Sequence, residues 1–222
     1  MTRNCAESCS VRSHFPWLAL VVAHLLCAPA CALTLPCHGL CVIAVHNLSL
    51  AALSSVLLVG IVHQLVQHWR LHARHGVAWA SWVLFCDPSP HQVRSGLLMF
   101  FYYLNYLTKI VELSDTVLLC LRGKPLHFLH VYHHAATLVL TWTQLVAKSG
   151  VQWVPIVLNL TVHVPMYYYY AVATLGQSPW WKKYLTTAQI VQFCIDVPAT
   201  GVATLLKVRT LGETGVCLTA ED

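Results

Sequence analysis

The chain has 222 residues, of which 57% are hydrophobic and 9% are charged, and its formal net charge is +5. Soluble domains carry roughly 25% charged residues, so this composition excludes an ordinary water-soluble domain and indicates a protein embedded in a bilayer. The Lys and Arg residues lie between apolar segments and form no basic patch, so no nucleic-acid partner is expected.

Six apolar segments are long enough to cross a bilayer, because a spanning helix needs about 20 mostly apolar residues. They are residues 16–35, 42–66, 96–121, 126–147, 151–175 and 184–206. The stretch 77–85 is too short to span and is expected to lie at the membrane interface. We therefore expect an all-α, polytopic membrane protein with about six transmembrane helices in a single domain, residues 1–222.

The first segment fits two structures. Arg12 precedes an apolar run that ends in Ala28, Pro29 and Ala30. This pattern is typical of a retained transmembrane helix and also of a secretory signal peptide with a small-residue cleavage site. Both alternatives stay open for residues 1–39.

The third segment carries charged residues on one face. Asn105, Lys109, Glu112, Asp115 and Thr116 fall within an arc of about 120° when a helix turns about 100° per residue. Ionisable groups inside a membrane helix are costly and are functional candidates by default. Lys109 and Glu112, three residues apart, can also neutralise each other as a structural ion pair.

The fourth segment opens with three histidines on one helical turn. His130, His133 and His134 occupy positions i, i+3 and i+4, so their imidazoles converge on one side. A lone histidine on an apolar face is usually a hydrogen-bonded core residue. Three on one turn of a membrane segment indicate a functional site.

The last two segments carry matching polar faces. In the fifth, Asn159, His163, Tyr167 and Tyr170 share an arc of about 100°, and Pro165 is expected to kink the helix. The run of tyrosines also fits an interfacial aromatic belt, above all at Tyr168 and Tyr169, which point elsewhere. The sixth segment places Thr186, Gln189, Gln192 and Asp196 on about one face.

Four neighbouring helices thus each present one polar stripe. A stripe facing lipid would leave donors and acceptors unsatisfied in hydrocarbon, so all four stripes are expected to face inward. The prediction is a helical barrel or bundle with a polar interior site, open to lipid-like substrates.

These stripes, in this order, resemble the signatures of the fatty-acid elongases of the endoplasmic reticulum, the very-long-chain 3-oxoacyl-CoA synthases. The matching segments are KIVELSDT (109–116), HVYHH (130–134), NLTVHVPMYYYY (159–170), TTAQIVQ (186–192), HNLSL (46–50) and YLNYL (103–107). The resemblance is strongest over residues 40–200. The HVYHH form, preceded by LHFL (126–129), is similar to the fungal and protist branch.

The resemblance implies a condensation inside a helical barrel around an acyl tunnel. A long-chain acyl-CoA and malonyl-CoA would give a 3-oxoacyl-CoA, CO2 and CoA. Histidine titrates near neutrality, so we expect His133 to attack the thioester and His163 to steer decarboxylation or stabilise the enolate. Further polar contacts are expected from His130, His134, Asn159, Tyr167, Tyr170, Gln189 and Gln192, with Lys109, Glu112 and Asp115 holding the histidines in register.

The resemblance also implies the surroundings of the site. Arg122, Lys124, Lys182 and Lys183 suit the phosphates of CoA at a cytosolic opening, and a solvated-loop role fits each of them as well. No cofactor and no metal are expected, and the substrates are acyl-CoA and malonyl-CoA. Expected partners are membrane lipid, the ketoreductase, dehydratase and enoyl reductase of the elongation cycle, and a second copy of the chain. The expected location is the endoplasmic reticulum membrane.

The chain departs from the family pattern at its ends. Family members have seven spans and a basic C-terminus, whereas residues 207–222 form a divergent tail that is neither apolar nor basic. The chain is therefore expected to be truncated, and an inactive elongase paralogue is one alternative. Loop charges alone favour a cytosolic N-terminus. The resemblance implies a lumenal one, with hairpins 122–125 and 180–183 in the cytosol, and we adopt it.

Two other classes of protein fit parts of the pattern. Desaturases and hydroxylases hold two irons with several histidine boxes, and residues 130–134 resemble one such box. The other histidines form no second box, since those at 63, 68, 72 and 75 are differently spaced. The third class is a transporter or receptor with a polar core. Incubation with labelled malonyl-CoA and an acyl-CoA separates it from the enzyme, because only the enzyme would give a chain-extended product.

The cysteines are expected to be buried free thiols. There are ten, mostly in or beside apolar segments, and those at 27, 31, 37 and 41 match no familiar zinc spacing. Cys120 falls on about the same face as Lys109 and is an alternative nucleophile, although the elongase pattern does not require a cysteine there.

Overall fold

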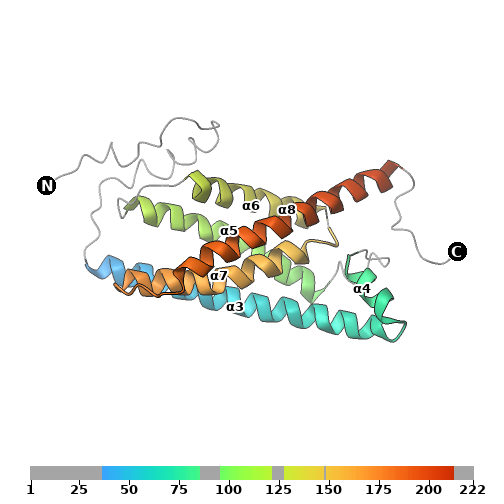
Figure 1. The fold of residues 1–222 in the computed structure, drawn as a ribbon, viewed down its shortest axis with the longest axis horizontal. Helices are drawn as coiled ribbons and strands as arrows, with labels where there is room; N and C mark the ends of the chain where they lie inside the picture. The colour runs from blue at the N-terminus through green and yellow to red at the C-terminus, as the bar shows by residue number, and fades with distance from the viewer. Residues whose placement is uncertain (1–36, 86–95, 122–127, 148, 213–222) are drawn as a thin grey trace. The chain divides into compact units, whose positions relative to one another are not determined.

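The computed structural model describes residues 37–85, 96–121, 128–147 and 149–212 (Figure 1). Nearly all of these residues are helical. The helices are α3 (Cys37–Ala73), α4 (Val77–Phe85), α5 (Leu97–Leu121), α6 (Phe128–Val146), α7 (Trp153–Thr174) and α8 (Lys182–Gly212). The predicted all-α class is therefore confirmed.

Two compact units make up the chain. The first unit contains residues 1–43 and 106–143, and the second contains residues 44–105 and 144–222. Most of α5 and α6 therefore belongs to the first unit. The second unit holds most of α3, the start of α5, and all of α4, α7 and α8.

Five of the six predicted spans coincide with helices. The ends of α5, α6 and α7 differ from the predicted ends by one or two residues, while α3 and α8 extend beyond theirs. The stretch 77–85, predicted to be too short to span, is the short helix α4. The first predicted span, 16–35, lies outside the described residues.

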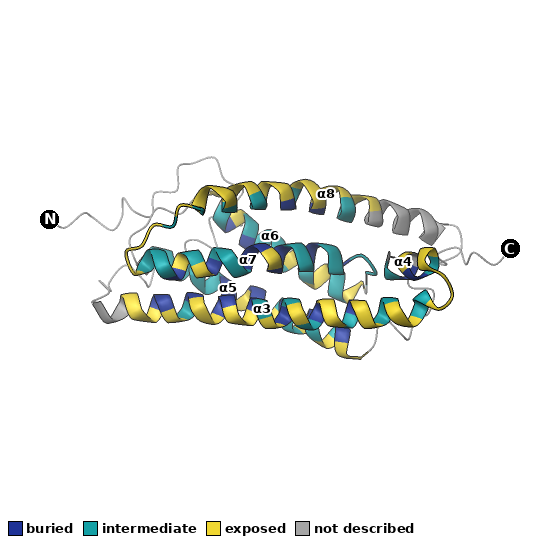
Figure 2. Ribbon diagram, turned by 60° about the horizontal axis from the view of Figure 1, so that its bottom comes forward, coloured by how far each residue is buried: buried dark blue, intermediate teal, exposed yellow. Residues whose placement is uncertain are grey.

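Apolar side chains cover both the buried and the exposed sides of α3. Its buried side carries Leu50, Leu57 and Ile61, yet Val45 and Val59 on other sides are 62% and 68% exposed. Figure 2 shows buried and exposed residues alternating along this helix. A helix that is apolar all round belongs in a membrane or a large core.

By length and composition alone, Leu40–Ala73 is the one stretch of the described residues that is apolar enough to cross a bilayer. The polar stripes of α5 to α8 lower the mean hydropathy of those helices.

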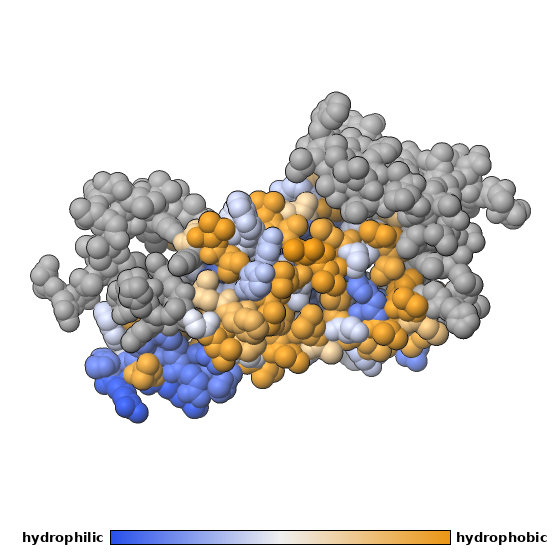
Figure 3. Space-filling model, turned by 180° about the vertical axis from the view of Figure 1, so that it is seen from behind, coloured by the Kyte–Doolittle hydropathy of each residue, from blue (hydrophilic) through white to orange (hydrophobic). Residues whose placement is uncertain are grey.

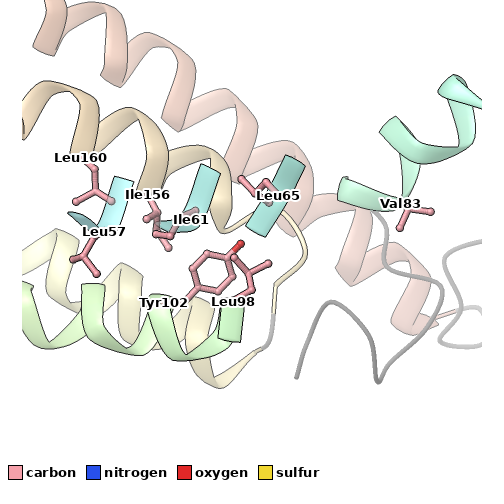
Figure 4. Packing of buried hydrophobic residues seen from close by; sticks show 8 residues of the cluster. All are labelled: Leu57, Ile61, Leu65, Val83, Leu98, Tyr102, Ile156 and Leu160. Atoms are coloured by element: carbon pink, nitrogen blue, oxygen red, sulfur yellow. The ribbon is translucent and has the colours of Figure 1, made fainter. Parts of the chain in front are cut away.

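A hydrophobic core holds the second unit together (Figure 4). Side chains four residues apart on each helix meet, because such positions share a helix face. The members are Leu57, Ile61 and Leu65 of α3, Val83 of α4, Leu98 and Tyr102 of α5, and Ile156 and Leu160 of α7. This cluster fixes the face that α7 turns toward α3, and hence the orientation of the polar residues of α7.

A tight connection joins α7 to α8. The N–H of Gln177 donates to the carbonyl of Val172, and the N–H of Gly176 donates to that of Ala173, both at 3.1 Å. These are the two hydrogen bonds of a Schellman motif, which requires a left-handed residue that glycine adopts without strain. Gly176 accordingly has φ of +86°. The chain then reverses, and α8 packs against α7.

Gly60 of α3 packs closely against α5, since a Cβ added there would lie 2.6 Å from Cζ of Phe101. We expect Gly60→Leu to lower the free energy of unfolding by about 1–3 kcal/mol, because the added side chain overpacks this contact. Gly201→Leu is the matched control, since nothing lies within 4 Å of its Cβ position. Thermal unfolding in detergent measures both, and equal effects at the two sites would contradict the contact.

Candidate active site

A buried ion pair lies on α5 in the first unit. Lys109 and Glu112 are 3% and 2% exposed, and Lys109 Nζ donates to both carboxylate oxygens of Glu112 at 2.9 and 3.0 Å. The spacing of three residues brings the two side chains together on one helix face. The predicted pairing is therefore confirmed. Asp115 is half-buried on the next turn.

The three histidines of α6 form one cluster in the same unit. The ring of the buried His134 lies 4.4 Å from the ring of His130 and 5.7 Å from the ring of His133, between centroids. His130 and His133 are half-buried. His130 Nε2 is hydrogen-bonded to Oγ1 of the buried Thr116 at 3.4 Å, which ties this cluster to α5. The ring of the half-buried His133 thus packs against His134 while part of the residue stays exposed.

A second polar cluster lies on α7 in the other unit. Asn159, His163 and Tyr167 are all buried, and Asn159 Nδ2 is 3.1 Å from His163 Nε2. The amide nitrogen can only donate, so Nε2 of His163 accepts and the neutral ring carries its proton on Nδ1. The ring of Tyr167 meets the His163 ring edge-on at 5.2 Å and fixes its plane. This geometry makes Nδ1–H of His163 a preorganised donor.

The polar residues of α8 continue this cluster. Gln189 Nε2 is 3.4 Å from the sulfur of Met166, which sets the register between α8 and α7. Because the two helices are joined by a short hairpin and run antiparallel, Gln192 lies at the level of His163 and Asp196 at the level of Asn159. Gln192 Nε2 donates to Oδ2 of Asp196 at 3.0 Å, and both residues are buried.

Two sets of buried polar residues were not among the predicted site residues. Asp196 was seen on the α8 stripe but was not assigned a role, although it is a buried carboxyl in a membrane helix. On α3, Asn47 and Ser54 are also buried. Their spacing of seven residues, which is two helical turns, could have shown that both lie on one face of α3. This spacing is easily overlooked, because each is a single polar residue between long apolar runs.

The remaining predicted site residues lie at the periphery. Tyr170 is 40% exposed, although its ring is 6.2 Å from that of Tyr167. Lys182 and Lys183 are exposed at the start of α8, with their Nζ atoms 5.7 Å from the Tyr169 ring and 5.1 Å from the Tyr184 ring. Arg122 and Lys124 lie outside the described residues.

Three cysteines of the described residues differ from the predicted buried free thiols. Cys41 and Cys194 are free but exposed, because their helices turn these small apolar side chains outward. Cys120 is disulfide-bonded. A disulfide sulfur is no thiolate, so Cys120 in this state cannot serve as the alternative nucleophile.

Within each unit, the structure brings together the residues that the sequence grouped. The cluster of α5 and α6 and the cluster of α7 and α8 each have the predicted inward-facing polar side chains. The convergence of all four stripes on one chamber stays a prediction. Among the described residues, no three His, Cys, Asp or Glu side chains are arranged to hold one metal ion.

These features define a class of protein: a helical membrane protein whose polar stripes carry histidines. The chain matches the GNS1/SUR4 (ELO) family over residues 34–216 and belongs to that family. It is thus a member of a family of multi-pass membrane proteins. The match extends beyond residues 40–200, where the motifs carry the resemblance.

Several named proteins are similar to the chain. "Fatty acid elongase A" of Dictyostelium discoideum is 42% identical over 152 residues, covering 68% of this chain and 52% of the relative. "Fatty acid elongase sre1" of the same organism is 40% identical over 151 residues, 67% of this chain and 53% of the relative. "Very long chain fatty acid elongase 2" of Mus musculus is 30% identical over 175 residues, 72% of this chain and 53% of the relative.

The higher identity to the Dictyostelium proteins confirms the predicted fungal and protist-like branch. The chain spans about half the length of the curated relatives it matches. No solved structure matches it significantly.

The ion pair on α5 leads to a stability prediction. We expect Lys109→Met or Glu112→Leu alone to lower the free energy of unfolding by about 3–5 kcal/mol, because each leaves one uncompensated buried charge. The double variant Lys109→Met, Glu112→Leu is expected to recover most of this loss. Unfolding in detergent measures all three, and a double variant no more stable than the single ones would contradict a mutually neutralising pair.

Proposed function

We propose that this chain carries out fatty acid elongation by condensing a long-chain acyl-CoA with malonyl-CoA to a 3-oxoacyl-CoA. It would thus act as an acyltransferase, a very-long-chain 3-oxoacyl-CoA synthase, in the endoplasmic reticulum membrane. The observation that carries the proposal is the cluster of His130, His133 and His134 on α6 of an elongase-family chain. Three imidazoles on one turn supply both a nucleophile and its hydrogen-bonding neighbours.

The first step is acyl transfer to His133. A neutral imidazole nitrogen of His133 attacks the thioester carbonyl, which gives an acyl-imidazole and releases CoA. His133 is half-buried, whereas His134 is buried between it and His130, so His133 has the better access to a thioester. His134 and His130 hold the cluster in place through ring packing and the hydrogen bond of His130 to Thr116.

The second step is carbon–carbon bond formation. Loss of CO2 from malonyl-CoA leaves an enolate, whose carbon attacks the acyl-imidazole, forms the 3-oxoacyl-CoA and frees His133. We assign His163 to the enolate oxygen. Asn159 occupies Nε2, so the proton on Nδ1 is the one that can be donated to a developing negative charge. Tyr167 and Asn159 hold the ring, so little reorganisation is needed when that charge develops.

The CoA phosphates are assigned to the start of α8. Lys182 and Lys183 are exposed, and their Nζ atoms lie over tyrosine rings of the same unit. Such contacts restrict the lysine side chains while leaving the ammonium groups open to solvent and to phosphate. Arg122 and Lys124 are assigned to the same role from the sequence.

The proposal needs no cofactor beyond the two CoA substrates. The product requires reduction, dehydration and a second reduction, so a ketoreductase, a dehydratase and an enoyl reductase are the proposed partners, alongside membrane lipid. A homo-oligomer is compatible with this scheme. The alternatives are an inactive elongase paralogue and a histidine-box di-iron desaturase or hydroxylase.

Elongation by purified protein in phosphatidylcholine vesicles tests the proposal. Labelled malonyl-CoA and a series of acyl-CoA lengths are expected to give products two carbons longer. His133→Ala is expected to abolish them, because the acyl-imidazole cannot form. His63→Ala is the matched control. His63 is exposed and bonds only to Gln67 among the described residues, so activity should persist.

Absence of extended product from the wild-type chain at every acyl length would indicate the inactive paralogue. Stoichiometric iron in the same preparation would favour the di-iron alternative.

Lys182→Gln, Lys183→Gln tests the CoA site. The expected result is a rise in KM for malonyl-CoA of about tenfold or more with kcat nearly unchanged, because phosphate contacts bind ground state and transition state alike. The rise should shrink at high salt, since exposed charge pairs are screened. A fall in kcat at unchanged KM would instead place these lysines close to the chemistry.

A further inference from the structure

An apolar groove lies near the C-terminal end of α3. None of its lining residues belongs to either histidine cluster. Its volume is about 250 Å³, and three helices of the second unit supply its walls. The lining residues are Val62, Leu65, Val66 and Trp69 of α3, Leu84 of α4, and Trp153 and Val157 of α7. No polar side chain takes part, so the groove suits a hydrocarbon chain.

The groove has a fixed wall. Trp153 Nε1 donates to the carbonyl of Leu84 at 3.0 Å, which fastens the end of α4 to the start of α7. Val83 of α4 packs in the same core as Leu65 and Ile156. The short helix α4 is therefore held by both a hydrogen bond and buried apolar contacts. These interactions fix the position of the wall that α4 contributes to the groove.

The position of the groove along α3 places it at the membrane interface. A helix of 37 residues is about 55 Å long, whereas the hydrocarbon core is about 30 Å thick. After the apolar run of residues 56–62, polar side chains recur at His63, Gln64 and Gln67, which marks where α3 leaves the hydrocarbon. Trp69 and Trp153 flank the groove at this level, as is typical of tryptophans at membrane interfaces.

The charged end of α3 continues the same helix face. Val62, Val66 and Arg70 are four residues apart, so Arg70 follows the groove by one turn, and Arg74 follows directly after the helix. Both arginines are exposed, and neither is in an ion pair within the described part of the chain. Figure 3 shows hydrophilic residues gathered at the lower left, where α3 ends, beside the apolar surface.

We propose that this end of the second unit is a binding site for an anionic phospholipid. Arg70 and Arg74 bind the negatively charged headgroup, and the upper part of one acyl chain lies in the groove between α3, α4 and α7. The apolar groove alone would accept any membrane lipid. The two arginines at its interfacial end supply the preference for negative charge. The site is separate from the proposed condensation and does not depend on it.

Photolabelling in nanodiscs tests the site. The protein is placed in phosphatidylcholine nanodiscs with a minor fraction of phosphatidylserine that carries a diazirine on its acyl chain near the glycerol. Peptide mass spectrometry is expected to find the label in residues 62–69 and 153–157. Unlabelled phosphatidylserine should compete for this labelling, whereas added phosphatidylcholine should not.

Two variants separate the headgroup from the groove. Arg70→Gln, Arg74→Gln is expected to weaken binding about 30-fold, since each arginine near an anionic headgroup contributes about fivefold. Val66→Trp, which fills the groove without changing charge, is expected to reduce labelling as well. Lys207→Gln, Arg209→Gln removes two cations from α8 instead and should leave labelling unchanged.

Equal labelling by a phosphatidylcholine probe would overturn the proposal, because it would show bulk membrane lipid. Labelling that persists in the Arg70, Arg74 variant would do the same. The competition arm uses the wild-type chain alone, so the proposal stays testable even if a variant fails to fold. Elongation activity is not a readout here, so failure of this site leaves the proposed condensation untouched.

Discussion

Polar side chains on a membrane helix have no water to bond with, and each must find a partner inside the protein. The buried pair of Lys109 and Glu112 shows how this constraint acts on α5, since each charge is compensated by the other within one helical turn. The same requirement applies to His163 and Asn159 on α7 and to Gln192 and Asp196 on α8. Inward-facing stripes are the consequence, and they give each unit a polar interior.

The same constraint holds the histidines of this chain in fixed orientations, which suits them to catalysis. Side chains that are held by neighbours need little reorganisation when charge develops, which is the main electrostatic advantage of an enclosed site. His163 is fixed in plane by Tyr167 and in tautomer by Asn159, so the position of its N–H donor is defined before any substrate arrives. His133, the proposed nucleophile, is half-buried and its ring packs against that of the buried His134.

The α7–α8 hairpin and the end of α3, both in the second unit, are proposed to bind different ligands. The α7–α8 hairpin presents Lys182 and Lys183 beside aromatic rings, an arrangement suited to phosphates that arrive with a soluble substrate. The end of α3 presents Arg70 and Arg74 beside an apolar groove, an arrangement suited to a charged lipid that remains in the membrane. The difference lies in the neighbouring surface, which is aromatic and partly polar in one case and purely apolar in the other.

The helices and their polar faces follow from the sequence alone, because the hydrophobic period and the charges of a membrane helix are local properties. The sequence therefore predicted α5 to α7 within two residues at each end and the pairing of Lys109 with Glu112, whereas α8 runs six residues past its predicted end. Tertiary structure decided what depends on neighbours in other helices. Features of this kind are the hydrogen bond between Thr116 and His130, the register set by Gln189 and Met166, the burial of Asn47 and Ser54, the exposure of Tyr170, and the groove beside Trp69. No local period encodes which face of one helix meets which face of the next, since that depends on the packing of side chains far apart in the chain.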